Sequence, residues 1–493
     1  MKKLITLMLA LALCLSLAAV PASAEEPIKI VMMVDNTVIN QDNGRDAFEK
    51  RWEELNPGYD LEIVQPDHSA YYDVMQQRMS SADWPDVVLL SATYYSDYAA
   101  SGALWDMTEA WEESKTKNSG RFIGDNIIEG LKIDGKLYGF SPARGNGCVT
   151  YIKQAWLDAV GMDAPTTYDE YIAMCEAFVE KFGTYAISAA GFVGNEAPFI
   201  NYLPEFYQDA YPFFIQQEDG SWIDGFTEDN MKDALQRIQD AVAAGLIDKE
   251  TLTNKTSDAR NKFYDEKFGV FTYWAGTWAT NLKTNLEANG RDGELVALKP
   301  LEDCPLYYDR VPPVWCITTK CANPEKVFDA FIDTMLDGGD CQMLWTYGVE
   351  GVHWSKSAGT VLAGTAKEAT YEEGQFHMLE SMEKAGTLYT KNHIDPMLSL
   401  AAFAEGYYDP KEATVQPEAK AASEMFGEYS RMASIVPTTA EMSELNGDLT
   451  SIKNEIIADI ALGKISVEEG YERFAEEGLK MSNTIVESLN ALN

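Results

Sequence analysis

The chain has 493 residues, of which 46% are hydrophobic and 11% aromatic, and this composition fits a packed globular protein and not a disordered acidic tail. Acidic residues number 78 and basic residues 39, which gives a net charge of −39 at pH 7. Such a surface repels nucleic acid and anionic lipid, so we expect no nucleic-acid partner.

The first 24 residues predict a signal peptide. Lys2 and Lys3 precede an apolar run over residues 4–20, and residues 22–24 (Ala-Ser-Ala) form the small-residue pattern at which signal peptidase cuts. The run is shorter than the roughly 20 residues of a membrane-spanning helix, so we expect cleavage and a secreted, extracytoplasmic protein. Cys14 follows a leucine in the middle of the run, which argues against a lipid anchor at this cysteine.

Strand-like and helix-like segments alternate between residues 28 and 90. Continuous apolar runs predict strands at residues 28–34, 61–64 and 86–90. Apolar residues at helical spacing predict helices over residues 47–55 and 72–79. This βαβαβ order predicts an α/β fold with a parallel sheet, whose ligands bind at the carboxyl ends of the strands.

The loops after the first and third of these strands contain the first candidate ligand-binding residues. Asp35 and Asn36 follow the first strand, and Thr93, Tyr94 and Tyr95 follow the third. Each side chain can donate or accept a hydrogen bond. Plainer roles stay open, namely a turn at the first pair and helix capping with sheet packing at the second group.

Three later helices are marked by their first residues. Thr167 with Glu170 and Ser466 with Glu469 form capping-box patterns. Asn323 precedes a proline, and apolar residues then repeat at helical spacing until two glycines. These patterns predict structure and carry no functional meaning of their own.

Six cysteines follow the predicted signal peptide. A core of this size does not need disulfides, so buried free thiols are at least as reasonable as bridges. The chain has no CxxC pair and only four histidines, which argues against a zinc or thiol-redox site. We expect no cofactor and no metal in the ligand site, and a structural calcium ion stays open because the scattered Asp and Asn residues form no EF-hand spacing. The cysteines concerned are Cys148, Cys175, Cys304, Cys316, Cys321 and Cys341.

Several motifs occur in a recognisable order. Residues 85–104 contain PDVVLL and YAASGAL, residues 134–142 read DGKLYGFSP, and residues 156–170 contain WLD and PTTYDE. Residues 263–278 end in GTW, and residues 347–354 read YGVEGVHW. Together they resemble the extracellular solute-binding proteins of ABC sugar importers, the family that includes maltose-binding protein. The last motif resembles an element of a longer Gram-positive and clostridial subgroup.

This resemblance implies a two-lobed, periplasmic-binding-protein-like α/β fold with a hinge and an interlobe ligand cleft. It implies an N-terminal lobe of residues 25–143 and 313–345. It implies a C-terminal lobe of residues 144–312 and 346–493, which ends in C-terminal helices. We expect a monomer that is no enzyme and has no catalytic residue. It would capture a small-molecule carbohydrate, most simply an oligosaccharide, and deliver it to the transmembrane permease subunits of an ABC transporter.

A sugar-binding cleft needs aromatic platforms beside directional hydrogen-bonding groups. By resemblance, Trp278 matches the tryptophan of the family's GxW segment that lines the cleft, and Trp274 lies across Gly276 from it. Thr93 and Tyr94 match first-lobe residues that bind sugar hydroxyls. The alternative for both tryptophans is burial in the core.

The remaining candidates lie near the predicted hinge. Arg144 and Asn146 follow the hinge strand, and a guanidinium suits vicinal hydroxyls or a sugar carboxylate. Glu350 and Trp354 lie in the second hinge-side element, and Trp315 lies on a strand that returns to the lobe boundary. A solvated turn for the first pair and a structural ion pair for Glu350 are the alternatives that stay open.

Three other functional classes stay open as well. The chain could bind a non-sugar solute such as a peptide or a polyamine, or serve as a surface-interaction module. A secreted glycoside hydrolase would need two carboxylates about 5 to 10 Å apart. The sequence offers no GxSxG, HExxH or metal-ligand motif that would favour an enzyme.

Overall fold

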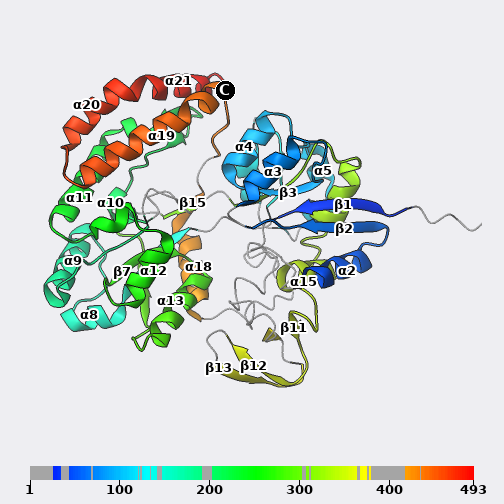
Figure 1. Cartoon of the computed structure of the whole chain (residues 1–493), viewed down its shortest axis with the longest axis horizontal. Coiled ribbons are helices and arrows are strands. Elements are labelled where there is room, and N and C mark those ends of the chain that lie inside the picture. The colour runs from blue at the N-terminus through cyan, green and yellow to red at the C-terminus, as the bar shows by residue number, and fades with distance from the viewer. Residues whose placement is uncertain are drawn as a thin grey trace, which may run out of the picture.

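The computed structural model places the elements of the chain in two lobes (Figure 1). The described residues are 26–34, 44–67, 70–119, 122, 125–133, 135–141, 147–190, 202–302, 307–309, 312–363, 367–374, 377–378, 417–432 and 435–492.

The first lobe is built on a four-stranded sheet of order β10-β3-β1-β2. β1 pairs in parallel with both β2 and β3, whereas β10 pairs antiparallel with β3. The predicted βαβαβ order is confirmed, because apolar strands and amphipathic helices alternate as the residue spacing requires. The elements are β1 (Ile28–Met33), α2 (Arg45–Leu55), β2 (Tyr59–Val64), α3 (Tyr71–Met79), β3 (Val87–Leu90) and β10 (Val314–Ile317).

Helices from two distant parts of the chain cover this sheet. A single core joins residues of the sheet to residues of the later helices, and Trp52, Trp315 and Trp345 lie fully buried in it. The covering elements are α4 (Ala92–Ala100), α5 (Thr108–Glu113), α6 (Lys115–Asn118), α7 (Asp125–Leu131), α14 (Pro324–Val327), the π-helix Phe328–Ile332 and α15 (Asp340–Tyr347).

The second lobe contains the antiparallel sheet β7-β4-β8. Every residue of β4 and β7 is buried, so this sheet is covered on both faces. The elements are β4 (Cys148–Lys153), α8 (Gln154–Val160), α9 (Tyr168–Phe182), α10 (Pro204–Tyr207), β5 (Phe214–Gln216), β6 (Trp222–Asp224), α11 (Asp229–Ala243), the 3₁₀-helix Lys249–Leu252, α12 (Thr256–Tyr264), β7 (Val270–Trp274), α13 (Thr277–Ala288) and β8 (Leu295–Ala297).

The C-terminal helices belong to this second lobe, as Figure 1 shows for α19 (Ala440–Ala461), α20 (Val467–Glu477) and α21 (Leu479–Asn490). A buried ion pair fixes them there. The Lys453 ammonium of α19 donates to Asp224 Oδ1 at 2.6 Å, and Ser482 Oγ of α21 donates to Asp224 Oδ2 at 2.7 Å. Both charges are satisfied inside the core, which is the condition for a buried pair to be tolerated.

The predicted helix starts differ in how their caps are made. At α20 both bonds of the capping box between Ser466 and Glu469 are present. At α9 Thr167 accepts from the Glu170 N–H, but the Glu170 carboxylate accepts from the Thr166 N–H instead. Asn323 precedes α14 without a side-chain capping bond, and the helix continues into the π-helix.

Residues 435–439 pass from one lobe to the other. Ile435 packs against the first core and Val436 against the second. Ser96 Oγ of α4 donates to the Val436 carbonyl at 2.9 Å, and Thr438 Oγ1 donates to Asp97 Oδ1 at 2.8 Å. These bonds attach the crossing segment to the helix that follows β3. The elements just before it are α18 (Pro417–Tyr429) and β15 (Ser430–Met432), which pairs with β9 (Tyr307–Asp309).

The remaining strands form two small pairs, β11 (Trp354–Ser355) with β14 (His377–Met378) and β12 (Gly359–Ala363) with β13 (Lys367–Tyr371). The five described cysteines are buried and form no disulfide with one another, and Cys304 lies outside the described residues. Among the helices described, none combines the length and apolar content needed to cross a membrane.

Candidate functional site

The turn after β7 presents Trp278 at the start of α13. Gly276 has a φ of 72°, which favours glycine, and a Cβ there would lie 3.2 Å from Ser423 Oγ of α18. Trp274, at the end of β7, is buried with the core of the second lobe, whereas Trp278 stays partly exposed. The turn therefore separates a structural indole from an accessible one.

Two residues hold the Trp278 indole in place. The Tyr273 ring meets it edge-on, with centroids 5.0 Å apart and an interplanar angle of 87°. The Arg260 guanidinium of α12 lies 4.9 Å from the indole centroid, and Arg260 Nη1 donates to the Tyr273 hydroxyl at 2.7 Å. A platform fixed in this way loses little side-chain entropy when a ligand stacks on it.

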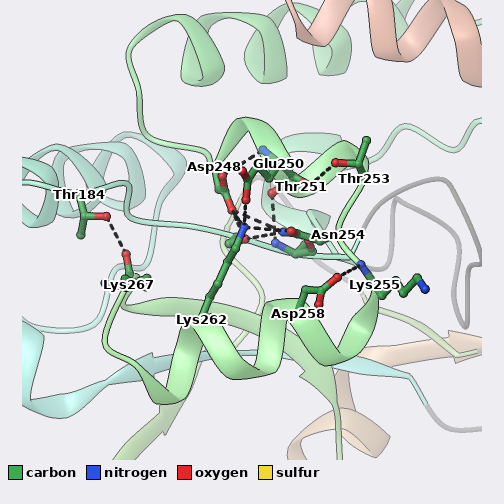
Figure 2. Close-up of polar contacts among 12 residues, drawn as sticks. Thr184, Asp248, Glu250, Thr251, Thr253, Asn254, Lys255, Asp258, Lys262 and Lys267 are labelled. Carbon is green, nitrogen blue, oxygen red and sulfur yellow. Dashed lines mark hydrogen bonds and ion pairs between the residues drawn. The ribbon is translucent and has the colours of Figure 1, made fainter.

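A polar cluster on the other side of α12 fixes the direction in which Arg260 points. Figure 2 shows Lys262 reaching from α12 towards Asp248, Glu250 and Asn254. The Lys262 ammonium lies 2.8 Å from Asp248 Oδ2 and 2.9 Å from Asn254 Oδ1. Residues two apart on a helix point about 200° apart, so Arg260 is directed away from this cluster.

The charge state of the cluster is set by its hydrogen bonds. Burial acts to raise the pKa of Asp248, but bonds from Lys262, the Glu250 N–H and Ser188 outweigh it and lower that pKa. Asn254 Nδ2 also donates to the Ala189 carbonyl at 3.1 Å. The charged cluster thus ties α12 to the chain segment that follows α9.

On the first lobe, Tyr94 belongs to an aromatic group at the carboxyl end of β3. Its ring stacks on Tyr72 of α3 with centroids 3.7 Å apart and an interplanar angle of 3°, and Tyr98 lies beyond it at 6.1 Å. The Tyr72 hydroxyl accepts from the Ser91 N–H at 2.7 Å. Tyr94 is partly exposed. The sequence predicts Tyr94 as a ligand-binding residue but gives no such signal for Tyr72, which lies in the predicted helix over residues 72–79.

Two candidates are corrected by the structure. Tyr95 is fully buried, and its hydroxyl donates to the Leu131 carbonyl at 2.7 Å and accepts from the Tyr138 N–H. Trp315 is fully buried between the Phe331 and Trp345 rings. Neither side chain has surface left for a ligand, because each lies inside the first core.

The segment that contains Glu350 and Trp354 lies with the first lobe, because Val349 packs on the core of that lobe. Trp354 is buried and its Nε1 donates to the Gly348 carbonyl at 3.0 Å, whereas Glu350 is exposed. Trp354 therefore fits a structural role better than a ligand platform, and only Glu350 of the pair presents its side chain to solvent.

The other predicted residues are only partly covered by the structure. Asp35, Asn36, Arg144 and Asn146 lie outside the described residues. Thr93 lies in the first turn of α4, whose N-cap is Ser91, so Thr93 is not the capping residue. Across the described part of the chain, no group of three or more His, Cys, Asp or Glu residues is placed to hold a metal ion.

Comparison with known families gives a match to bacterial extracellular solute-binding proteins over residues 41–302, more than half of the chain. Lipoprotein LipO of Bacillus subtilis is 24% identical over 349 residues, which cover 65% of this chain and 68% of LipO. The polygalacturonan/rhamnogalacturonan-binding protein YtcQ of Bacillus subtilis is 22% identical over 404 residues, 76% of each chain.

Solved structures show the same architecture. The alginate-binding protein AlgQ2, crystallised without calcium ion, superposes with a TM-score of 0.64 at 19% identity over 95% of this chain and 98% of its own. The N-glycan transport solute-binding protein NgtS of Streptococcus pneumoniae superposes with a TM-score of 0.63 at 16% identity, over 95% of this chain and 99% of its own. These likenesses confirm the predicted two-lobed, periplasmic-binding-protein-like α/β fold.

Proposed function

Because the chain belongs to the family of bacterial extracellular solute-binding proteins, we propose that it captures an oligosaccharide outside the cytoplasm for an ABC importer. The ligand is bound between the two lobes, and the closed form is recognised by the transmembrane permease subunits. The protein acts as a monomer and does no chemistry on its ligand.

The observation that carries this proposal is the Trp278 platform. A partly exposed indole, held on its turn by Gly276 and braced by Tyr273 and Arg260, offers a flat apolar face for the C–H side of a sugar ring. Tyr94 and Tyr72 offer an aromatic group on the first lobe at the carboxyl end of β3, where open α/β sheets bind ligands.

The relatives support a carbohydrate as the ligand class. YtcQ is a polygalacturonan- and rhamnogalacturonan-binding protein, and FusA of Streptococcus pneumoniae, 26% identical over 133 residues, is a fructooligosaccharide-binding protein. Capture proteins bind ligands that bridge the lobes, so the affinity should lie between micromolar and nanomolar, or about −8 to −12 kcal/mol.

A thermal-shift screen of residues 25–493 against oligosaccharides, amino acids, peptides and polyamines tests the proposal. Ligand binding to the folded state raises the melting temperature. We expect a saturable shift with one oligosaccharide class, lost in Trp278→Ala. Trp84→Ala is a matched control, because Trp84 is also partly exposed and carries a lysine ammonium, that of Lys320, over its ring.

If only peptides or amines raise the melting temperature, the proposed importer role stands and the proposed carbohydrate ligand is wrong. If Trp278→Ala and Trp84→Ala lose binding equally, the proposal that the ligand stacks on the Trp278 indole is wrong. If the protein converts an oligosaccharide to shorter products, the proposal that it does not act as an enzyme is wrong.

A further inference from the structure

Arg260 carries a positive charge that no acidic side chain balances in the part of the chain that the structure describes. Among the described residues no carboxylate lies within ion-pair distance of its guanidinium, which is also true of Arg237 and Arg291, whereas Arg45, Arg51, Arg78 and Arg473 have such partners. Arg260 differs from Arg237 and Arg291 in its position beside the partly exposed Trp278 indole.

The guanidinium also has hydrogen-bonding capacity to spare. It offers five N–H donors, and within the described structure its one hydrogen bond goes to the Tyr273 hydroxyl. Its other contacts are with aromatic rings, at 4.9 Å from the Trp278 centroid and 5.8 Å from the Tyr273 centroid. Arg260 is partly buried, so water replaces these missing partners only in part.

The position of Arg260 is fixed before any ligand arrives. Lys262 attaches the opposite side of α12 to Asp248, Glu250 and Asn254, as Figure 2 shows. A fixed guanidinium needs little reorganisation to bind an anion, and its planar donor fork matches a carboxylate.

We propose that Arg260 binds a carboxylate of the ligand, so that the captured carbohydrate is an acidic oligosaccharide containing uronic acid. This inference rests on the proposed function and narrows its substrate class. The oligosaccharide places C–H surface against the Trp278 indole and a carboxylate against the neighbouring guanidinium. A purely neutral ligand would leave the positive charge of Arg260 unbalanced in the bound state.

Calorimetric titration with trigalacturonate and with its fully methyl-esterified form, which is neutral, tests the charge directly. We expect the wild-type protein to bind the acid at least tenfold more tightly than the ester, with an affinity for the acid that falls as salt is added. Arg260→Gln should lose at least tenfold more affinity for the acid than for the ester, because losing the brace on Trp278 weakens both ligands alike and only the acid also loses its charge partner. Arg260→Lys should lie between the two, because it keeps the charge without the donor fork.

Arg291→Gln is the control, since it removes an exposed arginine of the same lobe. Arg260→Gln would affect acid and ester equally if Arg260 only braced Trp278, and that result would overturn the inference. Equal affinity of the wild-type protein for the ester and the acid would also overturn it. The same holds if the wider screen finds tight binding of neutral oligosaccharides but no binding of trigalacturonate. Failure of every sugar in that screen would instead overturn the proposed function, and this inference with it.

Discussion

Glu205 makes the stability of the second lobe depend on pH. Its side chain in α10 is fully enclosed by the core, and its Oε1 accepts a hydrogen bond from Thr150 Oγ1, which lies 2.8 Å from Thr272 Oγ1. Within the described structure Oε2 has no hydrogen-bond partner. Burial raises the pKa of Glu205 from its ordinary 4.5 to about 7, and the Thr150 bond opposes this only in part.

The sign of the effect follows from proton binding. Between pH 4.5 and 7 the folded protein keeps the Glu205 proton and the unfolded chain releases it, so stability is full at low pH and falls as pH rises. At about 1.4 kcal/mol for each pH unit, the full loss is about 3 kcal/mol, and about 2 kcal/mol of it falls between pH 5.0 and pH 7.5.

Urea unfolding of the wild type and of Glu205→Gln at these two pH values measures the effect. The amide does not titrate, so the variant should lack this part of the pH dependence, and the difference in unfolding free energy between the two proteins should change by about 2 kcal/mol. Glu476→Gln removes an exposed carboxylate of α20 and should follow the wild type. Parallel pH profiles for wild type and Glu205→Gln would refute the reasoning.

Three further changes test other features. Lys453→Met leaves the buried Asp224 carboxylate without its cation, and unfolding in urea should show a loss of about 3 to 5 kcal/mol; a loss below 1 kcal/mol would contradict a buried ion pair. Ser466→Ala removes the capping box of α20 and should cost about 1 kcal/mol by the same assay, whereas Ser466→Asp should recover most of it. Gly276→Ala forces a side chain into a positive-φ turn and should lower both the melting temperature and the ligand affinity. An unchanged ligand affinity would show that the turn does not position Trp278.

Local patterns in the sequence were enough to predict the first three strands of the first lobe and the two helices between them. The runs that became β1, β2 and β3 are apolar and short, and the helices between them carry apolar residues at helical spacing. The capping box at α20 was also predictable, because both of its hydrogen bonds join residues three positions apart.

The roles of individual aromatic residues were less predictable, because burial depends on tertiary packing. Trp315 and Trp278 are both followed by small or apolar residues in the sequence, yet one lies between two rings in the core and the other stands after a positive-φ glycine. The glycine before Trp278 is visible in the sequence, but no local pattern shows that the π-helix covers β10.

Arg260 and Glu205 were missed for a related reason. Arg260 reaches Trp278 only because α12 and α13 pack together, and no spacing in the sequence reports that contact. Glu205 lies among 78 acidic residues, and its burial follows from the packing of α10 on β4. A charged residue in an acidic chain gives no local signal of such a position.

The pairing of β3 with β10 has a consequence for how the protein is made. Val314 of β10 pairs with Leu90 of β3, so the edge of the first sheet stays open while the whole segment between them is synthesised. Closing so long a loop is entropically costly and slows folding. Until residues 314–317 are available to pair with it, β3 presents an unpaired edge to other chains, and this edge calls for chaperone protection during folding.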